Sequence, residues 1–331
     1  MVSQLAPERT EDRPVETTGS GGAGKGSGPS RFTRRHRPGH VSWPVVLLWL
    51  GPALALIFGV VLFPAYELVR ASLSEYSITG LKLGGAGTSN YRAVLEHPAL
   101  GTVLRNTVIW VIAVVSLTML LSLALAQFMA KEFFGRRLMR WAIIVPWAAS
   151  LVITARLFTL ILDYNHGVLN RLLQVLHVID EPVDFLGDDR FTMASMIGVG
   201  VFVSIPFTAY VLMAGLNAIP HDVYEAARMD GAKPFQIYRH ITLPLLAPAL
   251  SVATVLNIIY IFNSFPVVYT LNDRNPGYDH DTTITFMYKL AFKSADHSVG
   301  MSAAAGIFNV LLIVVVVLIY LRVINWKEAT Q

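Results

Sequence analysis

The stretch Phe191–Pro220, FTMASMIGVGVFVSIPFTAYVLMAGLNAIP, contains 30 residues and no Asp, Glu, Lys or Arg. A helix needs about 20 mostly apolar residues to cross the hydrocarbon core of a bilayer, so this stretch can span a membrane. Four other uncharged runs of 26, 25, 32 and 24 residues lie at Val41–Tyr66, Asn106–Ala130, Ile241–Asn272 and Ser298–Leu321. The sequence therefore excludes a soluble enzyme and predicts a membrane protein that crosses the bilayer several times.

The composition of the 331-residue chain supports this class. Hydrophobic residues make up 54% and charged residues only 15%, and the mean hydropathy is +0.53. Soluble domains carry about 25% charged residues. The chain has no cysteine, which excludes disulfides, thiolate metal sites and a cysteine nucleophile. We expect neither a metal site nor a nucleic-acid partner, and we interpret the net charge of +4 by its location rather than by its sum.

We expect an all-α, polytopic membrane protein with six transmembrane helices inside a domain that covers residues 43–325. The third span is the least regular because Arg156 interrupts it, and we place that residue near the membrane boundary, where its long side chain can reach water. The expected spans are about 44–69, 104–128, 141–162, 194–216, 246–269 and 302–321.

The distribution of Lys and Arg predicts the orientation. With the N-terminus in the cytoplasm, the cytoplasmic segments hold 16 basic residues and the outer segments hold 8. We therefore expect both chain termini to be cytoplasmic in a bacterial plasma (inner) membrane, with residues 326–331 as a short C-terminal tail.

The first 42 residues form a polar segment whose Gly/Ser-rich part, Thr17–Ser30, cannot bury a core, so we expect a disordered cytoplasmic tail. This part contains Gly19, then four residues, then Gly24-Lys25, which is close to a phosphate-binding loop. Gly26 stands where that motif needs Ser or Thr, and no strand precedes it, so we interpret the segment as a linker.

Residues 217–244, NAIPHDVYEAARMDGAKPFQIYRHITLP, combine several local helix signals. Pro220 suits the first turn of a helix, and Asp222 places negative charge near its positive N-terminal end. Gly231 can adopt the left-handed conformation that closes a helix, and Pro234 can begin another. The segment is predicted to form a short helix, a tight turn and a second short helix before Pro244 begins the fifth span.

Part of this loop resembles the cytoplasmic motif of ATP-binding-cassette importer permeases. That motif reads Glu-Ala-Ala, three residues, Gly, nine residues, Ile, one residue and Leu-Pro, and Glu225–Pro244 matches every defined position. The next stretch, LPLLAPALSVATVLNIIYIFNSF, resembles the maltose-type, larger-permease branch of the sugar importers. The short outer segment 70–103 is more similar to actinobacterial disaccharide permeases, including the first permease of trehalose importers. The resemblance covers about residues 43–325 and implies the type I importer permease fold.

The resemblance implies several partners and a division of labour among them. It pairs this chain with a second permease, with two copies of a cassette ATPase that binds ATP and Mg²⁺, and with an extracytoplasmic sugar-binding lipoprotein. The chain itself would hold no cofactor and would not be an enzyme. The 222–233 helix would contact a cleft of the ATPase, where small alanines permit close packing. The residues expected to couple to the ATPase, of which all but Asp230 stand at defined motif positions, are Glu225, Ala226, Ala227, Asp230 and Gly231.

A sugar needs hydroxyl-binding groups and an apolar or aromatic surface for its C–H faces. Asn257, Tyr260 and Ser264 fall on one face of the expected fifth span, with Asn263 beside them. Their positions and those of Ser204 and Phe207 match the sugar-contacting segments of the maltose-type branch. An alternative is that the Asn side chains only form hydrogen bonds between helices. The best substrate hypothesis is trehalose or a maltose-like disaccharide, although no residue pattern separates these from other oligosaccharides or glycerol phosphate.

Two other classes of protein compete with the importer permease. An ion-coupled secondary transporter of a small polar solute usually carries an Asp or Glu inside the membrane, and the interiors of the six expected spans contain neither. A membrane enzyme or scaffold would be expected to show a catalytic constellation such as clustered His and carboxylate side chains, which the sequence does not suggest.

Overall fold

The computed structural model describes residues 43–273, 275–294 and 298–328. The chain divides into two units, Met1–Ala55 and Leu56–Gln331. In the first unit, the described residues belong to the apolar helix α1 (Trp43–Leu56). The predicted tail of residues 1–42 lies outside the described residues, as do residues 329–331 of the expected C-terminal tail.

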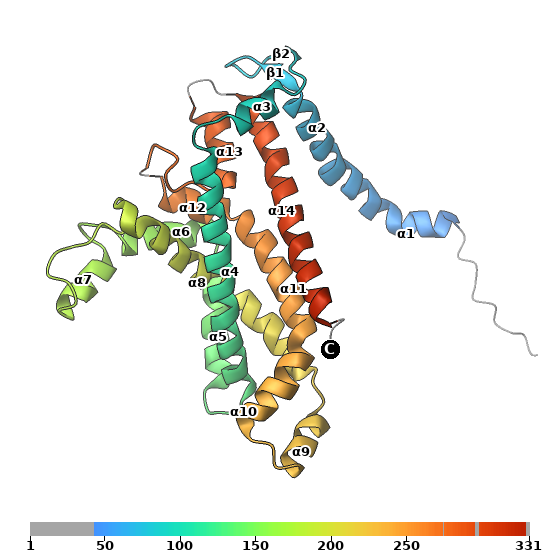
Figure 1. Cartoon of the computed structure of the whole chain (residues 1–331), viewed down its shortest axis with the longest axis vertical. Helices are drawn as coiled ribbons and strands as arrows, with labels where there is room; N and C mark the ends of the chain where they lie inside the picture. Colours follow the sequence, from blue (N-terminus) through green and yellow to red (C-terminus); the bar gives the residue numbers. More distant parts are fainter. Residues whose placement is uncertain (1–42, 274, 295–297, 329–331) are drawn as a thin grey trace, which may run out of the picture. The chain divides into compact units, whose positions relative to one another are not determined.

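The second unit is a helical bundle with a small β-hairpin and short helices at one end (Figure 1). The hairpin pairs antiparallel strands, with Ser74 opposite Gly85. It lies in segment 70–103, which the sequence analysis treated only as a short loop. The elements that precede α9 are a π-helical segment Ile57–Leu62, α2 (Phe63–Ser72), β1 (Ser74–Tyr76), β2 (Lys82–Gly85), α3 (Ser89–Leu95), α4 (Leu100–Ala130), α5 (Arg136–Trp147), α6 (Leu151–Ile161), α7 (Val168–Val175) and α8 (Asp189–Asn217).

The remaining elements form the loop between the fourth and fifth spans and the C-terminal part of the bundle. They are α9 (His221–Met229), α10 (Pro234–Ile237), a π-helical segment Tyr238–Thr242, α11 (Leu243–Phe262), α12 (Phe265–Leu271), α13 (Thr283–Phe292) and α14 (Val299–Glu328). Because α14 is helical through Glu328, residues 326–328 continue the last helix instead of forming a tail.

Five described helical segments are long and apolar enough to cross a membrane, which agrees with the predicted polytopic all-α class. The third expected span, 141–162, is not one helix, because α5 ends at Trp147 and α6 begins at Leu151. Ser150 between them is extended, with ψ 136°. The five candidate spans are Val46–Ser72, Leu100–Ala130, Asp189–Asn217, Pro234–Phe262 and Val299–Ile324.

The bundle is centred on the contact between α4 and α8, the most extensive helix pair in the described residues. Trp110 of α4 is 1% exposed and belongs to the largest buried apolar cluster. Its ring passes Gly200 of α8 so closely that a Cβ at that glycine would lie 2.6 Å from ring atom Cη2. The indole Nε1 donates a hydrogen bond to the carbonyl oxygen of Ile261 on α11 (3.1 Å). Trp110 therefore contacts two of the three helices that line the cavity described below.

We expect Gly200→Ala to destabilise the permease, because its methyl group would overlap the buried Trp110 ring. Overpacking of this kind costs about 1–3 kcal/mol. The matched control is Gly198→Ala on the same helix, where nothing lies within 4 Å of the added Cβ. That change should be neutral or slightly stabilising, because alanine favours a helix interior over glycine. Thermal unfolding of the two variants in the same detergent measures the difference, and an equal effect of both would contradict this account of the α4–α8 contact.

Candidate functional site

The 217–244 loop contains the predicted helix, turn and helix. Pro220 is the residue before α9, with extended backbone, and Asp222 lies in the first turn. The second helix differs from the prediction, because α10 continues through the π-helical segment into α11. The result is one helical segment from Pro234 to Phe262. The loop is therefore joined rigidly to the fifth span on one side and through residues 218–220 to α8 on the other.

Gly231 closes α9 in the conformation that the sequence predicted. Its φ is +77°, in the left-handed region that glycine adopts without strain. The N–H of Ala232 bonds to the carbonyl of Ala227 (3.0 Å), and the N–H of Gly231 bonds to that of Arg228 (3.0 Å). This double hydrogen bond is the Schellman arrangement that ends a helix. Nothing lies within 4 Å of a Cβ built at Gly231, so its requirement for glycine comes from the backbone angle alone.

Four of the five predicted ATPase-coupling residues are exposed to solvent, and one is buried. Glu225, Ala226, Asp230 and Gly231 are exposed, and the carboxylate of Glu225 lies 3.0 Å from Nδ1 of His221. Ala227 is only 7% exposed and packs within this chain. The expectation that its side chain meets a partner is therefore corrected, and its small size instead serves the packing of the loop itself.

Two large apolar side chains of the loop project into solvent, and the sequence analysis did not select them. Met229 is 87% exposed and Phe235 is 69% exposed, one on each side of the Gly231 turn. Exposed apolar side chains can pack against a partner protein. Met229 stands between two charged residues, a signal that the sequence already contained, whereas Phe235 has no charged neighbour in the sequence.

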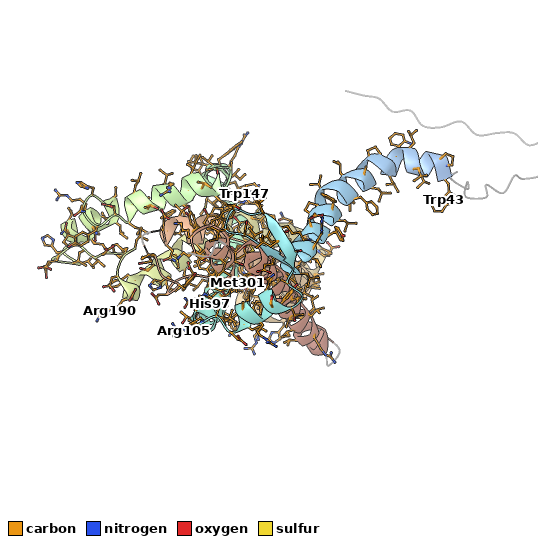
Figure 2. All side chains as sticks on the ribbon, turned by 90° about the horizontal axis from the view of Figure 1, so that it is seen from above. Trp43, His97, Arg105, Trp147, Arg190 and Met301 are labelled. Atoms are coloured by element: carbon orange, nitrogen blue, oxygen red, sulfur yellow. The ribbon has the colours of Figure 1, made fainter. Side chains whose placement is uncertain are left out.

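A cavity of about 310 Å³ lies among α5, α8 and α11. Four predicted substrate residues line it, so the structure brings together the predicted positions of two separate spans. Trp147, labelled in Figure 2, also lines it and was not among the predicted site residues. The helix break after Trp147 places the indole at the end of α5. The lining residues are Trp147, Val203, Ser204, Phe207, Leu256, Asn257 and Tyr260.

The cavity combines aromatic faces with a few polar groups. Trp147 and Phe207 stack with their ring centroids 6.4 Å apart and their planes 19° apart. Nδ2 of Asn257 donates to Oγ1 of Thr208 (2.7 Å) and to the carbonyl of Ala253 (3.1 Å). No described group donates to Oδ1 of Asn257, so this oxygen remains an acceptor for a ligand. Small-molecule sites typically have this mixture of apolar walls and a few placed polar atoms.

Asn263 and Ser264 are not among the residues that line this cavity. The predicted helical spacing fails here because α11 ends at Phe262. Asn263 is the C-terminal capping residue, and its Nδ2 donates back to the carbonyl of Ile259 (2.8 Å). Ser264 is 3% exposed and precedes α12. Both residues therefore serve the junction between the two helices. No group of three or more His, Asp or Glu side chains in the described part of the chain could hold a metal ion.

Residues 118–327 match the family model described as "Binding-protein-dependent transport system inner membrane component". The matched region contains the cavity and the α9 loop. It begins within α4 and ends within α14, so it covers more than half of the chain.

Individual relatives agree with this family. A probable ABC transporter permease protein of Brucella suis biovar 1 is 33% identical over 84% of this chain and 95% of its own length. The trehalose/maltose transport system permease protein MalF of Thermococcus litoralis is 33% identical over 73% of this chain and 80% of its own. Among solved structures, a bacterial alginate ABC transporter in complex with an alginate pentasaccharide-bound periplasmic protein gives a TM-score of 0.70 at 22% identity, covering 83% and 92% of the two chains.

Proposed function

This chain belongs to the binding-protein-dependent transport system inner membrane component family, the permeases of ABC importers, and we propose that it forms part of the membrane path for a neutral disaccharide. As a permease it is not an enzyme, because ATP hydrolysis belongs to the partner ATPase. The observation that carries the proposal is the cavity in which Trp147, Phe207 and Tyr260 face Asn257 and Ser204.

The chemistry of the cavity supports a sugar as substrate. Aromatic rings offer flat apolar surfaces to the C–H faces of a pyranose, and the free Oδ1 of Asn257 can accept a hydrogen bond from a hydroxyl. None of the lining residues is charged, which favours a neutral sugar over an acidic one. The relative from Thermococcus litoralis carries trehalose and maltose in its name. A trehalose-like or maltose-like disaccharide is therefore the substrate class that we propose.

The proposed complex contains a second permease, two copies of a cassette ATPase and an extracytoplasmic sugar-binding lipoprotein. The alginate transporter, which shares the fold, was solved with its periplasmic protein. In the proposed orientation both termini and the α9 loop are cytoplasmic, which the excess of basic residues in the corresponding segments supports. ATP and Mg²⁺ would be bound by the ATPase and not by this chain.

We further propose that α9 is the element through which the ATPase acts on the cavity. The exposed residues Glu225, Ala226, Asp230, Met229 and Phe235 surround the Gly231 turn. The helices on either side of the loop, α8 and α11, are the same two that carry the polar lining residues. The hydrogen bond from Asn257 to Thr208 joins these helices beside the cavity. A displacement of α9 therefore acts on both walls of the cavity together.

The transport proposal is tested with the four-component complex in proteoliposomes. We expect ATP-dependent uptake of trehalose or maltose that persists when ionophores collapse ion gradients. Trp147→Ala should lower the maximal uptake rate about tenfold, because the lost aromatic contact is worth about 1 kcal/mol or more.

The matched control is Trp141→Ala, which removes an equally large, exposed side chain from the same helix outside the cavity. This variant should transport at a rate close to that of the unmodified complex. Uptake that follows an ion gradient instead of ATP would support a secondary transporter. Equal losses in the two tryptophan variants would contradict the assignment of the cavity.

The role of the Gly231 turn is tested by two substitutions at one position. Gly231→Val forces a β-branched residue into positive φ at a cost of about 1–3 kcal/mol, so it should distort α9 and abolish uptake. Gly231→Asn should retain most of the activity, because asparagine tolerates the left-handed region better than valine. Copurification of the ATPase and sugar-stimulated ATP hydrolysis are measured for both variants. Full uptake and full stimulation in Gly231→Val would contradict the proposed coupling.

A further inference from the structure

A second cavity of about 190 Å³, which we call the groove, lies between α5 and α8. Its surface is apolar, and its lining residues are Ile144, Trp147, Pro206, Phe207 and Tyr210. Trp147 and Phe207, whose rings stack, line both this groove and the larger cavity. No polar side chain other than the hydroxyl-bearing Tyr210 lines the groove, so its walls suit a hydrocarbon chain better than a sugar.

The side of α5 that lines the groove becomes basic toward the N-terminal end of the helix. Arg136, Arg140, Ile144 and Trp147 are spaced by four, four and three residues, which places all four on one face of the helix. Two apolar positions at the groove are therefore preceded by two arginines, one turn apart. This end of α5 lies at the same end of the bundle as α9 and α10 (Figure 1), which is the proposed cytoplasmic side.

Arg140 on this face is half-buried and has an unsatisfied guanidinium N–H. Its Nε is shielded from solvent and has no hydrogen-bond partner among the described residues. The hydroxyl of Tyr210, a residue that lines the groove, donates to the backbone carbonyl of Arg140 (3.1 Å), so Arg140 is anchored at the groove. A buried guanidinium N–H without an acceptor is costly. A rotation of the partly exposed guanidinium would bring this N–H to a phosphate oxygen, which would accept a charge-assisted hydrogen bond.

We propose that this groove is a binding site for an anionic phospholipid of the cytoplasmic leaflet. The phosphate contacts Arg140 and Arg136, and an acyl chain occupies the apolar groove beside Ile144 and Pro206. Basic pockets between transmembrane helices on the cytoplasmic side bind anionic headgroups in this way. Because the acyl chain contacts Trp147 and Phe207, lipid bound here would support two rings that also line the substrate cavity.

The test uses the complete, delipidated complex in detergent, with bound lipid counted by native mass spectrometry. Dioleoyl phosphatidylglycerol is titrated against dioleoyl phosphatidylcholine and against glycerol 3-phosphate, which has the phosphate but no acyl chain. We expect phosphatidylglycerol to bind more tightly than either of the other two. Arg140→Gln should weaken its binding about fivefold, which corresponds to the roughly 1 kcal/mol contributed by one arginine near an anionic headgroup.

The matched control is Arg239→Gln, which removes the same charge from an exposed position of the π-helical segment Tyr238–Thr242, outside α5. It should change phosphatidylglycerol binding less than twofold. Arg136→Gln, on the face that leads to the groove, should weaken phosphatidylglycerol binding about as much as Arg140→Gln. It replaces Arg140→Gln in the test if that variant fails to assemble. Equal losses at positions 239 and 140 would overturn the site in favour of diffuse attraction to basic residues. If glycerol 3-phosphate binds as tightly as phosphatidylglycerol, the site binds a soluble anion and the lipid proposal is wrong. Lipid counting requires neither sugar nor ATP, so failure here is distinguishable from failure of the transport proposal.

Discussion

The buried indole of Trp110 holds together the three helices on which the rest of the described bundle depends. Its ring fits against α8 only because residue 200 has no side chain, and its N–H bonds to the carbonyl of Ile261 on α11. A buried indole N–H without a partner would be costly, so this bond fixes where α11 lies relative to α4. The cavity between α5, α8 and α11 is formed against this fixed frame. The packing of Trp110 against Gly200 and its hydrogen bond to Ile261 thus hold together the helices that carry the candidate substrate residues.

The same helices connect the cavity with the α9 loop. Ser204 and Phe207 lie in α8 before the loop, and Asn257 and Tyr260 lie in α11 after it. Since α10 and α11 form one helical segment, the far side of the Gly231 turn has no flexible joint before the cavity. This continuity gives a physical basis for the proposed coupling, in which a partner that moves α9 moves the cavity walls as well.

The sequence predicted best what local chemistry determines. The end of α9 at Gly231 follows from one residue that must adopt positive φ, and the long uncharged runs follow from the bilayer's thickness. The helix break at Ala148–Ser150 was missed because small uncharged residues do not interrupt an apolar run in the sequence. Asn263 and Ser264 do not line the cavity, because the helical spacing was extended past the real end of α11. The burial of Ala227 and the role of Trp147 depend on tertiary packing, which spacing in a single sequence does not reveal.

The most direct test of the central claim, that α9 contacts the ATPase, uses the absence of cysteine from this chain. A single cysteine is introduced at Ala226, which is exposed, or at the adjacent Ala227, which is 7% exposed. Each assembled complex is treated with a short bifunctional maleimide, with the ATPase carrying cysteines at its surface cleft. The account predicts a permease–ATPase cross-link from position 226 and little or none from position 227. Equal cross-linking from both positions, or none from position 226 in an active complex, would contradict it.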